Sequence, residues 1–243
     1  MELTILHLYP ELMSLYGEYA NLAVLRRHLE DLGVTVTVKP ISCEDIPDFD
    51  GADFIYMGAG TERSQKSVLM GLVHHADKLK AAVENGALLL FTGNAMEMLG
   101  SSITDTAGKV WPALALADFT TEESDKRVPH DVIAETSLFG EKLVGFMNKC
   151  SLTHGITTPL FTALPMGFGN DAKGGSEGYM AGNIYATHIT GPILAKNPPL
   201  LRHLIGRIFA GKGWTLPETL PAYPYEEGAY EVTLRELSAR LEK

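Results

Sequence analysis

The first ninety residues alternate between two hydrophobic periods, and this alternation limits the folds open to the chain. Continuous apolar runs are separated by segments in which leucine and valine recur at helical spacing. Apolar strands joined by helices are typical of a parallel sheet covered on both faces. The expected strands are 3–8, 34–41, 52–60 and 87–93, and the expected helices are 22–32 and 68–83.

Right-handed crossovers place the carboxyl ends of such strands along one edge of the sheet, where open α/β sheets hold their ligands. We therefore predict an α/β fold with a mostly parallel sheet and helices on both faces. Two glycine-bearing loops, GAGTERSQ at 58–65 and TGNAMEML at 92–99, would lie at that edge.

The pattern weakens past residue 100, where we predict loops and short strands. The polar segment TTEESDKRVPHD (120–131) is predicted to be a loop, and 167–183 a glycine-rich excursion. Short strands are expected at 132–136, 143–148 and 184–189, and a helix with proline in its first turn at 197–211. No repeat or linker divides the chain, so we expect one domain over 1–243. Its C-terminal extension, 212–243, has loosely helical spacing and could pack on the body or on a partner.

Composition excludes several classes of function. The net charge of −10 disfavours nucleic acid as a partner. Two cysteines, Cys43 and Cys150, are too few for a disulfide framework or a closed zinc site, and we expect neither metal nor other cofactor. No apolar stretch approaches the roughly 18 residues of a membrane span. The N-terminus resembles a first strand and not a cleaved leader, so we expect a cytoplasmic protein without membrane contact.

The stretch ENGALLLFTGNAMEMLG (84–100) has the outline of an active site. It predicts a strand, a tight turn with small neighbours and a helix that begins near Met96. This arrangement is typical of a nucleophile elbow, which exposes its apex side chain to the positive end of a helix dipole. The apex residue here is Gly93, which has no nucleophilic atom.

The order of these elements resembles that of class I glutamine amidotransferases, which have a flavodoxin-like fold. In that family the elbow reads cysteine, any residue, glycine, any residue, glutamine. On this chain the three motif positions fall on Gly93, Ala95 and Glu97, so all three depart from the pattern.

Other segments resemble the cobyric-acid-synthase type of this family, and within it the small glutaminase subunits of lipid II isoglutaminyl synthases. The similar blocks follow the family's order from about residue 5 to about residue 210. They are 7–33, 53–65, 126–135, 145–148, 167–178 and 191–198.

The resemblance places a general base, histidine in the family, directly before the Gly-Pro of THITGPIL, where this chain has Thr190. The nearest histidine is His188, and a shift of two residues along a strand moves a side chain about 6–7 Å. A base must come within roughly 2.6–3.2 Å of its nucleophile. We therefore expect no catalytic residues of the family type, with the nucleophile position vacated at Gly93 and the base position at Thr190.

Ligand-binding candidates surround the same edge. The backbone of Gly58, Ala59 and Gly60 matches the family's oxyanion loop, although small residues could equally let a helix start close to the sheet. Arg127 matches an arginine that holds glutamine in the isoglutaminyl synthase subunit, unless it is simply solvated. Glu97 could cap its helix. The candidates are Gly58, Ala59, Gly60, Asn94, Glu97, Arg127 and His188.

Three functions remain open. The first is an amidotransferase-like protein without glutaminase activity that acts as a binding or regulatory partner of an ATP-dependent synthetase. That synthetase would be Mur-ligase-like, in cell wall biogenesis, or a cobyric or cobyrinic acid enzyme, in cobalamin biosynthesis. The second is a different enzyme acting on a small amide or carboxylate through Asn94, Glu97, His188 or Thr190, which predicts a tight polar pocket and a carboxyl group of raised pKa. The third is an active glutaminase with a relocated nucleophile such as Cys150, four residues before His154.

Overall fold

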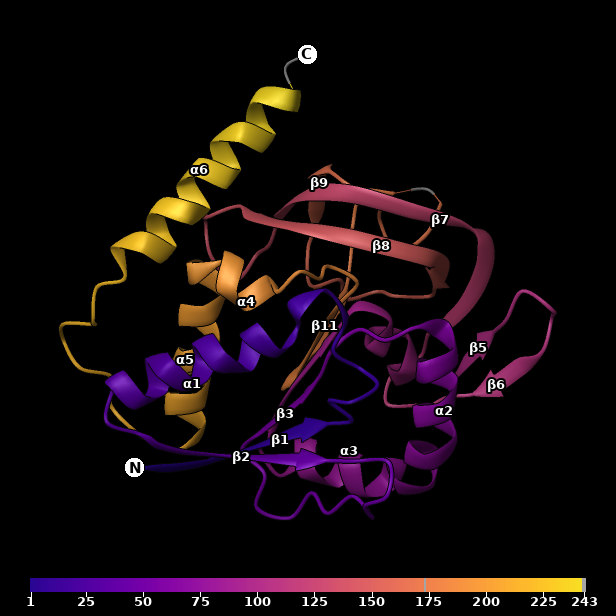
Figure 1. Cartoon of the computed structure of the whole chain (residues 1–243), viewed down its shortest axis with the longest axis horizontal. Helices are drawn as coiled ribbons and strands as arrows, with labels where there is room; N and C mark the ends of the chain where they lie inside the picture. The colour runs from indigo at the N-terminus through magenta and orange to yellow at the C-terminus, as the bar shows by residue number, and fades with distance from the viewer. Residues whose placement is uncertain (173, 242–243) are drawn as a thin grey trace.

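The structure, a computed structural model, describes residues 1–172 and 174–241. Its central sheet has the strand order β10-β11-β4-β3-β1-β2, and every pairing in it is parallel except that of β10 with β11 (Figure 1). This confirms the mostly parallel sheet expected from the apolar runs. The strands are β1 (Glu2–Leu8), β2 (Thr35–Ile41), β3 (Phe54–Met57), β4 (Leu88–Thr92), β10 (Tyr179–Ala181) and β11 (Ile184–Thr187).

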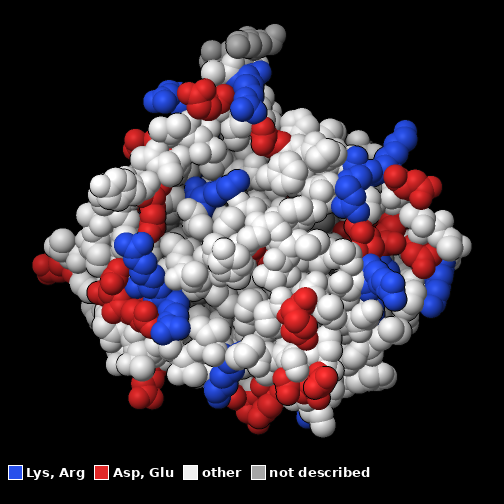
Figure 2. Space-filling model, in the orientation of Figure 1, with Lys and Arg blue, Asp and Glu red and all other residues white. Residues whose placement is uncertain are grey.

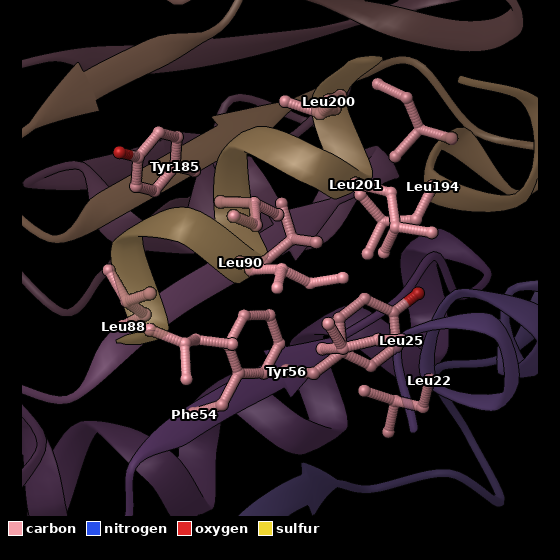
Figure 3. Close-up of a cluster of buried hydrophobic side chains, with 14 of the residues drawn as sticks. Leu22, Leu25, Phe54, Tyr56, Leu88, Leu90, Tyr185, Leu194, Leu200 and Leu201 are labelled. Atoms are coloured by element: carbon pink, nitrogen blue, oxygen red, sulfur yellow. The ribbon is translucent and has the colours of Figure 1, made fainter. Parts of the chain in front are cut away.

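Alternate residues of the strands point to opposite faces of this sheet, and helices cover both faces, which gives two separate cores. One core contains Phe54, Tyr56 and Leu90, and packs against α1 (Tyr19–Asp31), α4 (Ile193–Lys196) and α5 (Pro198–Gly211) (Figure 3). The other contains Ile55, Met57 and Phe91, and packs against α2 (Glu62–Leu72) and α3 (Ala76–Glu84). The single long helix expected over 68–83 was wrong in detail, because the 3-10 turn η2 (Val73–His75) separates α2 from α3.

A second sheet lies beside the elbow and was largely missed by the sequence analysis. The segment 120–131, predicted as a polar loop, is part of the long strand β7, which pairs antiparallel with β8. Polar residues are tolerated in this strand because most of their side chains are exposed to solvent, while its backbone is paired with β8. The expected short strands at 132–136 and 143–148 are parts of these longer strands. The sheet comprises β5 (Ser102–Thr104), β6 (Val110–Pro112), β7 (Thr120–Glu135), β8 (Leu143–His154) and β9 (Ala163–Met166).

Two local features bring this second sheet to the edge of the first. A bridge between Phe146 and Thr190 joins β8 to the segment that follows β11. A bulge between Glu123 and Val128 interrupts β7, and bulges of this kind re-aim side chains next to active sites. Arg127 lies within this bulge and lines the same crevice as Gly93.

The elbow itself is followed by a tight 3-10 helix, η3 (Gly93–Leu99), and not by the α-helix that was expected from Met96 onward. A further 3-10 turn, η1 (Leu15–Gly17), precedes α1. All the residues of η3 except Asn94 are buried, so the segment is part of the core and not an exposed helix start.

The C-terminal helix α6 (Pro224–Leu241) lies beside the body in Figure 1 and packs on it through a few buried side chains. Tyr230 and Leu237 contact Ile133 and Val144 in a small apolar cluster. The Tyr230 hydroxyl donates to the Lys142 carbonyl oxygen at 2.6 Å. Among the described residues, no helix has the length and apolar content needed to cross a membrane.

Leu237→Ala is expected to loosen α6, because this side chain is 5% exposed and its truncation leaves a cavity costing about 2 kcal/mol. Val232→Ala is the matched control, since Val232 is 48% exposed on the same helix. Hydrogen exchange of α6 amides should accelerate in the first variant only. Equal acceleration in both would show that α6 does not depend on this cluster.

Candidate functional site

Gly93, at the apex of the elbow, has no room for a side chain. Its φ angle is +62°, in the left-handed region that favours glycine. A Cβ atom added there would lie 2.4 Å from the Ala59 Cβ and 3.0 Å from the Thr190 Cγ2. Two methyl groups therefore close over the position that the family resemblance assigns to the nucleophile.

The loop at 58–60 faces the elbow, and its backbone is already engaged. The Gly60 N–H donates to the Asn94 side-chain oxygen at 2.9 Å. Gly58 and Gly60 also have a packing role, because a Cβ on either would lie within 2.8 Å of atoms of Met13. Close packing of the segment after β1 therefore requires glycine at both positions, and the oxyanion interpretation would require Asn94 to move away from Gly60.

The two candidate residues after β11 have different environments. Thr190 donates its N–H to the Phe146 carbonyl oxygen at 2.7 Å, and its methyl group faces Gly93. His188 is held between two carboxylates instead. Its Nδ1 lies 3.0 Å from Glu177 Oε1 and its Nε2 lies 3.4 Å from Glu97 Oε1.

Glu97 is the centre of a buried polar network. It accepts hydrogen bonds from Gln65 and Ser151 and pairs with His188. Burial, the largest influence, favours the neutral acid, yet these partners together hold the pKa of Glu97 below its usual value. Burial and Lys149 lower the pKa of His188, but Glu177 and Glu97 outweigh them and raise it. The Glu97 carboxylate and a protonated His188 therefore favour one another.

The alternative enzyme predicts a carboxyl group of raised pKa at this pocket, and two of the carboxyl groups that line it differ in this respect. Glu97 has a lowered pKa because His188 and its hydrogen-bond donors stabilise the carboxylate. Glu123, which also lines the crevice, does have a raised pKa, since burial outweighs its pairing with Lys66. Its carboxylate is engaged by that lysine.

Arg127 and Cys150 lie together at the mouth of the crevice. Arg127 donates to the Glu62 carboxylate and to the Asn148 carbonyl oxygen, the latter at 3.0 Å. The Cys150 thiol lies 3.2 Å from Glu62 Oε1. Burial, followed by this carboxylate, raises the pKa of Cys150 to about 12 and suppresses the reactive thiolate. His154 lies four positions further along β8, roughly 13 Å by strand geometry, so it is out of reach of the thiol.

The crevice between these groups is small, with a cavity volume of about 20 Å³. That volume accommodates about one water molecule. No group of three or more His, Cys, Asp or Glu residues within 1–172 and 174–241 is arranged to hold a metal ion. The lining includes Tyr16, Ala59, Gly60, Glu62, Gly93, Asn94, Glu97, Glu123, Arg127, Asn148, Lys149, Cys150, Ser151, His188 and Thr190.

The structure thus brings Ala59, Gly60, Asn94, Glu97, Arg127 and His188 to one crevice, while Gly58 packs against Met13. The loops at 58–65 and 92–99 lie at this edge as the parallel topology predicted, whereas Arg127 comes from β7 of the second sheet. Sequence reasoning missed Glu177 and Ser151, which hold His188 and Glu97, because no spacing pattern links them to the elbow. On the face shown in Figure 2, acidic and basic side chains interleave and no continuous basic surface forms.

Comparisons with known proteins identify the family of this chain. The CobB/CobQ-like glutamine amidotransferase domain matches residues 4–198. The lipid II isoglutaminyl synthase (glutamine-hydrolyzing) subunit GatD of Staphylococcus aureus is 30% identical over 213 residues, which covers 87% of this chain and 86% of the relative. GatD of Streptococcus pneumoniae is 27% identical over 225 residues, covering 91% and 86%.

Solved structures share the fold at lower identity. One glutamine amidotransferase superposes with a TM-score of 0.53 at 13% identity, over 86% of this chain and 98% of its own. A glutamine amidotransferase from Thermotoga maritima gives a TM-score of 0.54 at 11% identity, over 98% and 97%. With the domain match spanning most of its length, this chain belongs to the CobB/CobQ-like glutamine amidotransferase family.

Proposed function

We propose that this protein is a glutamine amidotransferase-like subunit without glutaminase activity that acts as a binding or regulatory partner of an ATP-dependent synthetase. The observation that supports this most directly is the elbow. Gly93 has no nucleophilic atom, and the methyl groups of Ala59 and Thr190 occupy the space that a nucleophile would need.

The surrounding groups support the same proposal. Thr190 stands where the family resemblance places the base, and its side chain cannot accept a proton as an imidazole does. His188 is held by Glu97 and Glu177, so it is committed to the buried network. Hydrolysis by the family mechanism would lack both its nucleophile and its base.

The crevice also argues against tight binding of glutamine. Its volume of about 20 Å³ accommodates about one water molecule, so a bound glutamine would require the walls to move apart. Arg127, which by resemblance would hold the substrate, is engaged by the Glu62 carboxylate. A small amide or carboxylate would have to displace both this ion pair and the packing around Gly93.

A ligand that binds the native state raises the melting temperature by mass action. Since the crevice is closed, we expect L-glutamine at about 10 mM to leave the melting temperature of the wild-type protein unchanged. Thermal denaturation with and without the amino acid measures this. D-Glutamine serves as the chemically matched control. A rise specific to L-glutamine would show that the crevice opens and would contradict the proposed closed site.

The partner is proposed from the relatives, which are named as subunits of lipid II isoglutaminyl synthase. By family resemblance the other subunit is a Mur-ligase-like synthetase. Co-expression of this chain with such a synthetase from the same organism, followed by size-exclusion chromatography with light scattering, tests the proposal. Co-elution at a fixed stoichiometry is expected, and separate elution of the two chains would overturn it.

A reconstituted complex gives a second readout. The synthetase is expected to form its amide product when ammonium salts supply the nitrogen and not when L-glutamine does, since this subunit would release no ammonia from L-glutamine. Amidation driven by L-glutamine would refute the loss of hydrolysis while leaving the partnership intact.

A further inference from the structure

Besides lacking a nucleophile, the elbow has no space for one, because Ala59 fills the volume beside Gly93. The Ala59 Cβ lies 2.4 Å from the place of a Cβ on Gly93, closer than real carbon atoms of this kind approach. The Ala59 Cα lies only 3.1 Å from the same place, so the obstacle includes backbone that cannot rotate away. Ala59 is 3% exposed and its carbonyl oxygen accepts the Leu15 N–H at 2.9 Å, which fixes the loop in this position.

The neighbouring hydrogen-bond donor is occupied as well. The Gly60 N–H, which lies in the loop matched to the family's oxyanion site, donates to the Asn94 side-chain oxygen. Only an acceptor satisfies that donor, so the oxygen of the amide must face Gly60. The Asn94 backbone oxygen in turn accepts from Gln65 at 2.6 Å, which holds residue 94 in place.

We propose that Ala59 and Asn94 are specificity-determining residues that keep the amidotransferase elbow closed, Ala59 by filling the volume of the apex side chain and Asn94 by occupying the Gly60 N–H. This inference rests on the proposed function, since it explains how the non-hydrolysing site is maintained. It follows that a cysteine restored at position 93 does not fit while Ala59 is present. Room for that cysteine requires Ala59→Gly together with Gly93→Cys.

A double-mutant cycle between positions 59 and 93 tests the contact. Gly93→Ala is expected to lower the melting temperature by about 10 °C, because it adds both left-handed strain and a steric overlap. In an Ala59→Gly background the same change is expected to cost about half as much. The 2.4 Å overlap with the Ala59 Cβ is then gone, while the strain and the approaches of 3.0 Å to Thr190 Cγ2 and 3.1 Å to the Cα of residue 59 remain. Equal losses in the two backgrounds would overturn the proposal.

Gly182→Ala is the matched control for backbone strain. Gly182 has a φ angle of +58°, close to that of Gly93, and has no atom within 4 Å of the place of its Cβ. Its substitution should lower the melting temperature by only about 4 °C, and by the same amount with or without Ala59→Gly. A dependence of this control on residue 59 would show that the cycle reports a general loosening and would count against the contact.

The Asn94 contact has its own readout. In Asn94→Ala, the Gly60 amide is expected to exchange its hydrogen about tenfold faster, whereas Asn94→Asp, which keeps the acceptor oxygen, should retain slow exchange. Unchanged exchange in Asn94→Ala would overturn the role assigned to this side chain.

Activity measurements separate this inference from the proposed function. Wild-type protein that hydrolyses L-glutamine would refute the proposed function. If the wild type is silent but Gly93→Cys/Thr190→His hydrolyses L-glutamine with Ala59 in place, the proposed function survives and the blocking role of Ala59 is refuted. We expect both proteins to be silent.

Discussion

Purified wild-type protein is expected to release no ammonia from L-glutamine above the buffer rate. Removal of the nucleophile from a comparable hydrolase lowers turnover by about 10⁶, which leaves only the contributions of binding and oxyanion stabilisation. Here Gly93 offers no nucleophile, and the Gly60 N–H in the matching loop is bonded to Asn94. A coupled glutamate dehydrogenase assay, calibrated with an active amidotransferase of the same family, measures the rate.

Cys150→Ala is the control that distinguishes silence from a relocated nucleophile. Because the pKa of Cys150 is raised to about 12, the substitution should leave the ammonia signal at background. Ammonia release by the wild type that disappears in Cys150→Ala would assign the nucleophile to that thiol. Release that persists in the variant would point to another group in the crevice.

The second large effect concerns stability. Glu97→Gln is expected to destabilise the fold by about 1–3 kcal/mol. It removes the charged acceptor of the Gln65 and Ser151 hydrogen bonds and one of the two carboxylates beside buried His188, which keeps Glu177 as its partner. The Glu97 and His188 side chains are 4% and 1% exposed, so solvent cannot replace the lost partner. The free energy of unfolding from urea titration measures the loss.

The effect should depend on pH in a defined direction. The pKa of His188 is raised in the folded protein, so this histidine contributes its full stabilisation at a pH below its unfolded pKa of about 6.5. That stabilisation is lost as the pH rises through the pKa of the folded state. The pKa of Glu97 is lowered in the folded protein, so this carboxylate contributes its full stabilisation at a pH above its unfolded pKa of about 4.5. That stabilisation is lost as the pH falls through the pKa of the folded state. The stability difference between wild type and Glu97→Gln should therefore be largest between these two values.

Two variants control for trivial causes. Glu84→Gln removes a carboxylate whose side chain is 66% exposed, and it should change stability by no more than about 0.5 kcal/mol. The double variant Glu97→Gln/His188→Gln removes both charges, so it should lose less than the sum of the two single variants. Strict additivity would mean that the two side chains do not act as a pair.

Much of the fold could be predicted because its signals are local. The apolar run at 88–92 and the helical spacing of Leu22, Leu25 and Leu29 each specify an element within one window of sequence, and β4 and α1 formed where these patterns indicated. The strand β7 could not be predicted in this way. Its partner β8 supplies the hydrogen bonds, and the residues 120–131 are polar because most of them are exposed to solvent.

The sequence by itself determined that the chain is an α/β protein with an elbow whose apex is Gly93, because strand periods and a missing side chain are local facts. Only the tertiary structure decided that Ala59 and Thr190 pack over that apex, that Asn94 occupies the Gly60 N–H and that Glu177 and Glu97 hold His188. These contacts join residues that are 34 to 97 positions apart, except that Glu177 and His188 are 11 positions apart and flank the β10–β11 hairpin. No periodicity encodes such distances, since they arise when separate elements meet at one edge of a sheet.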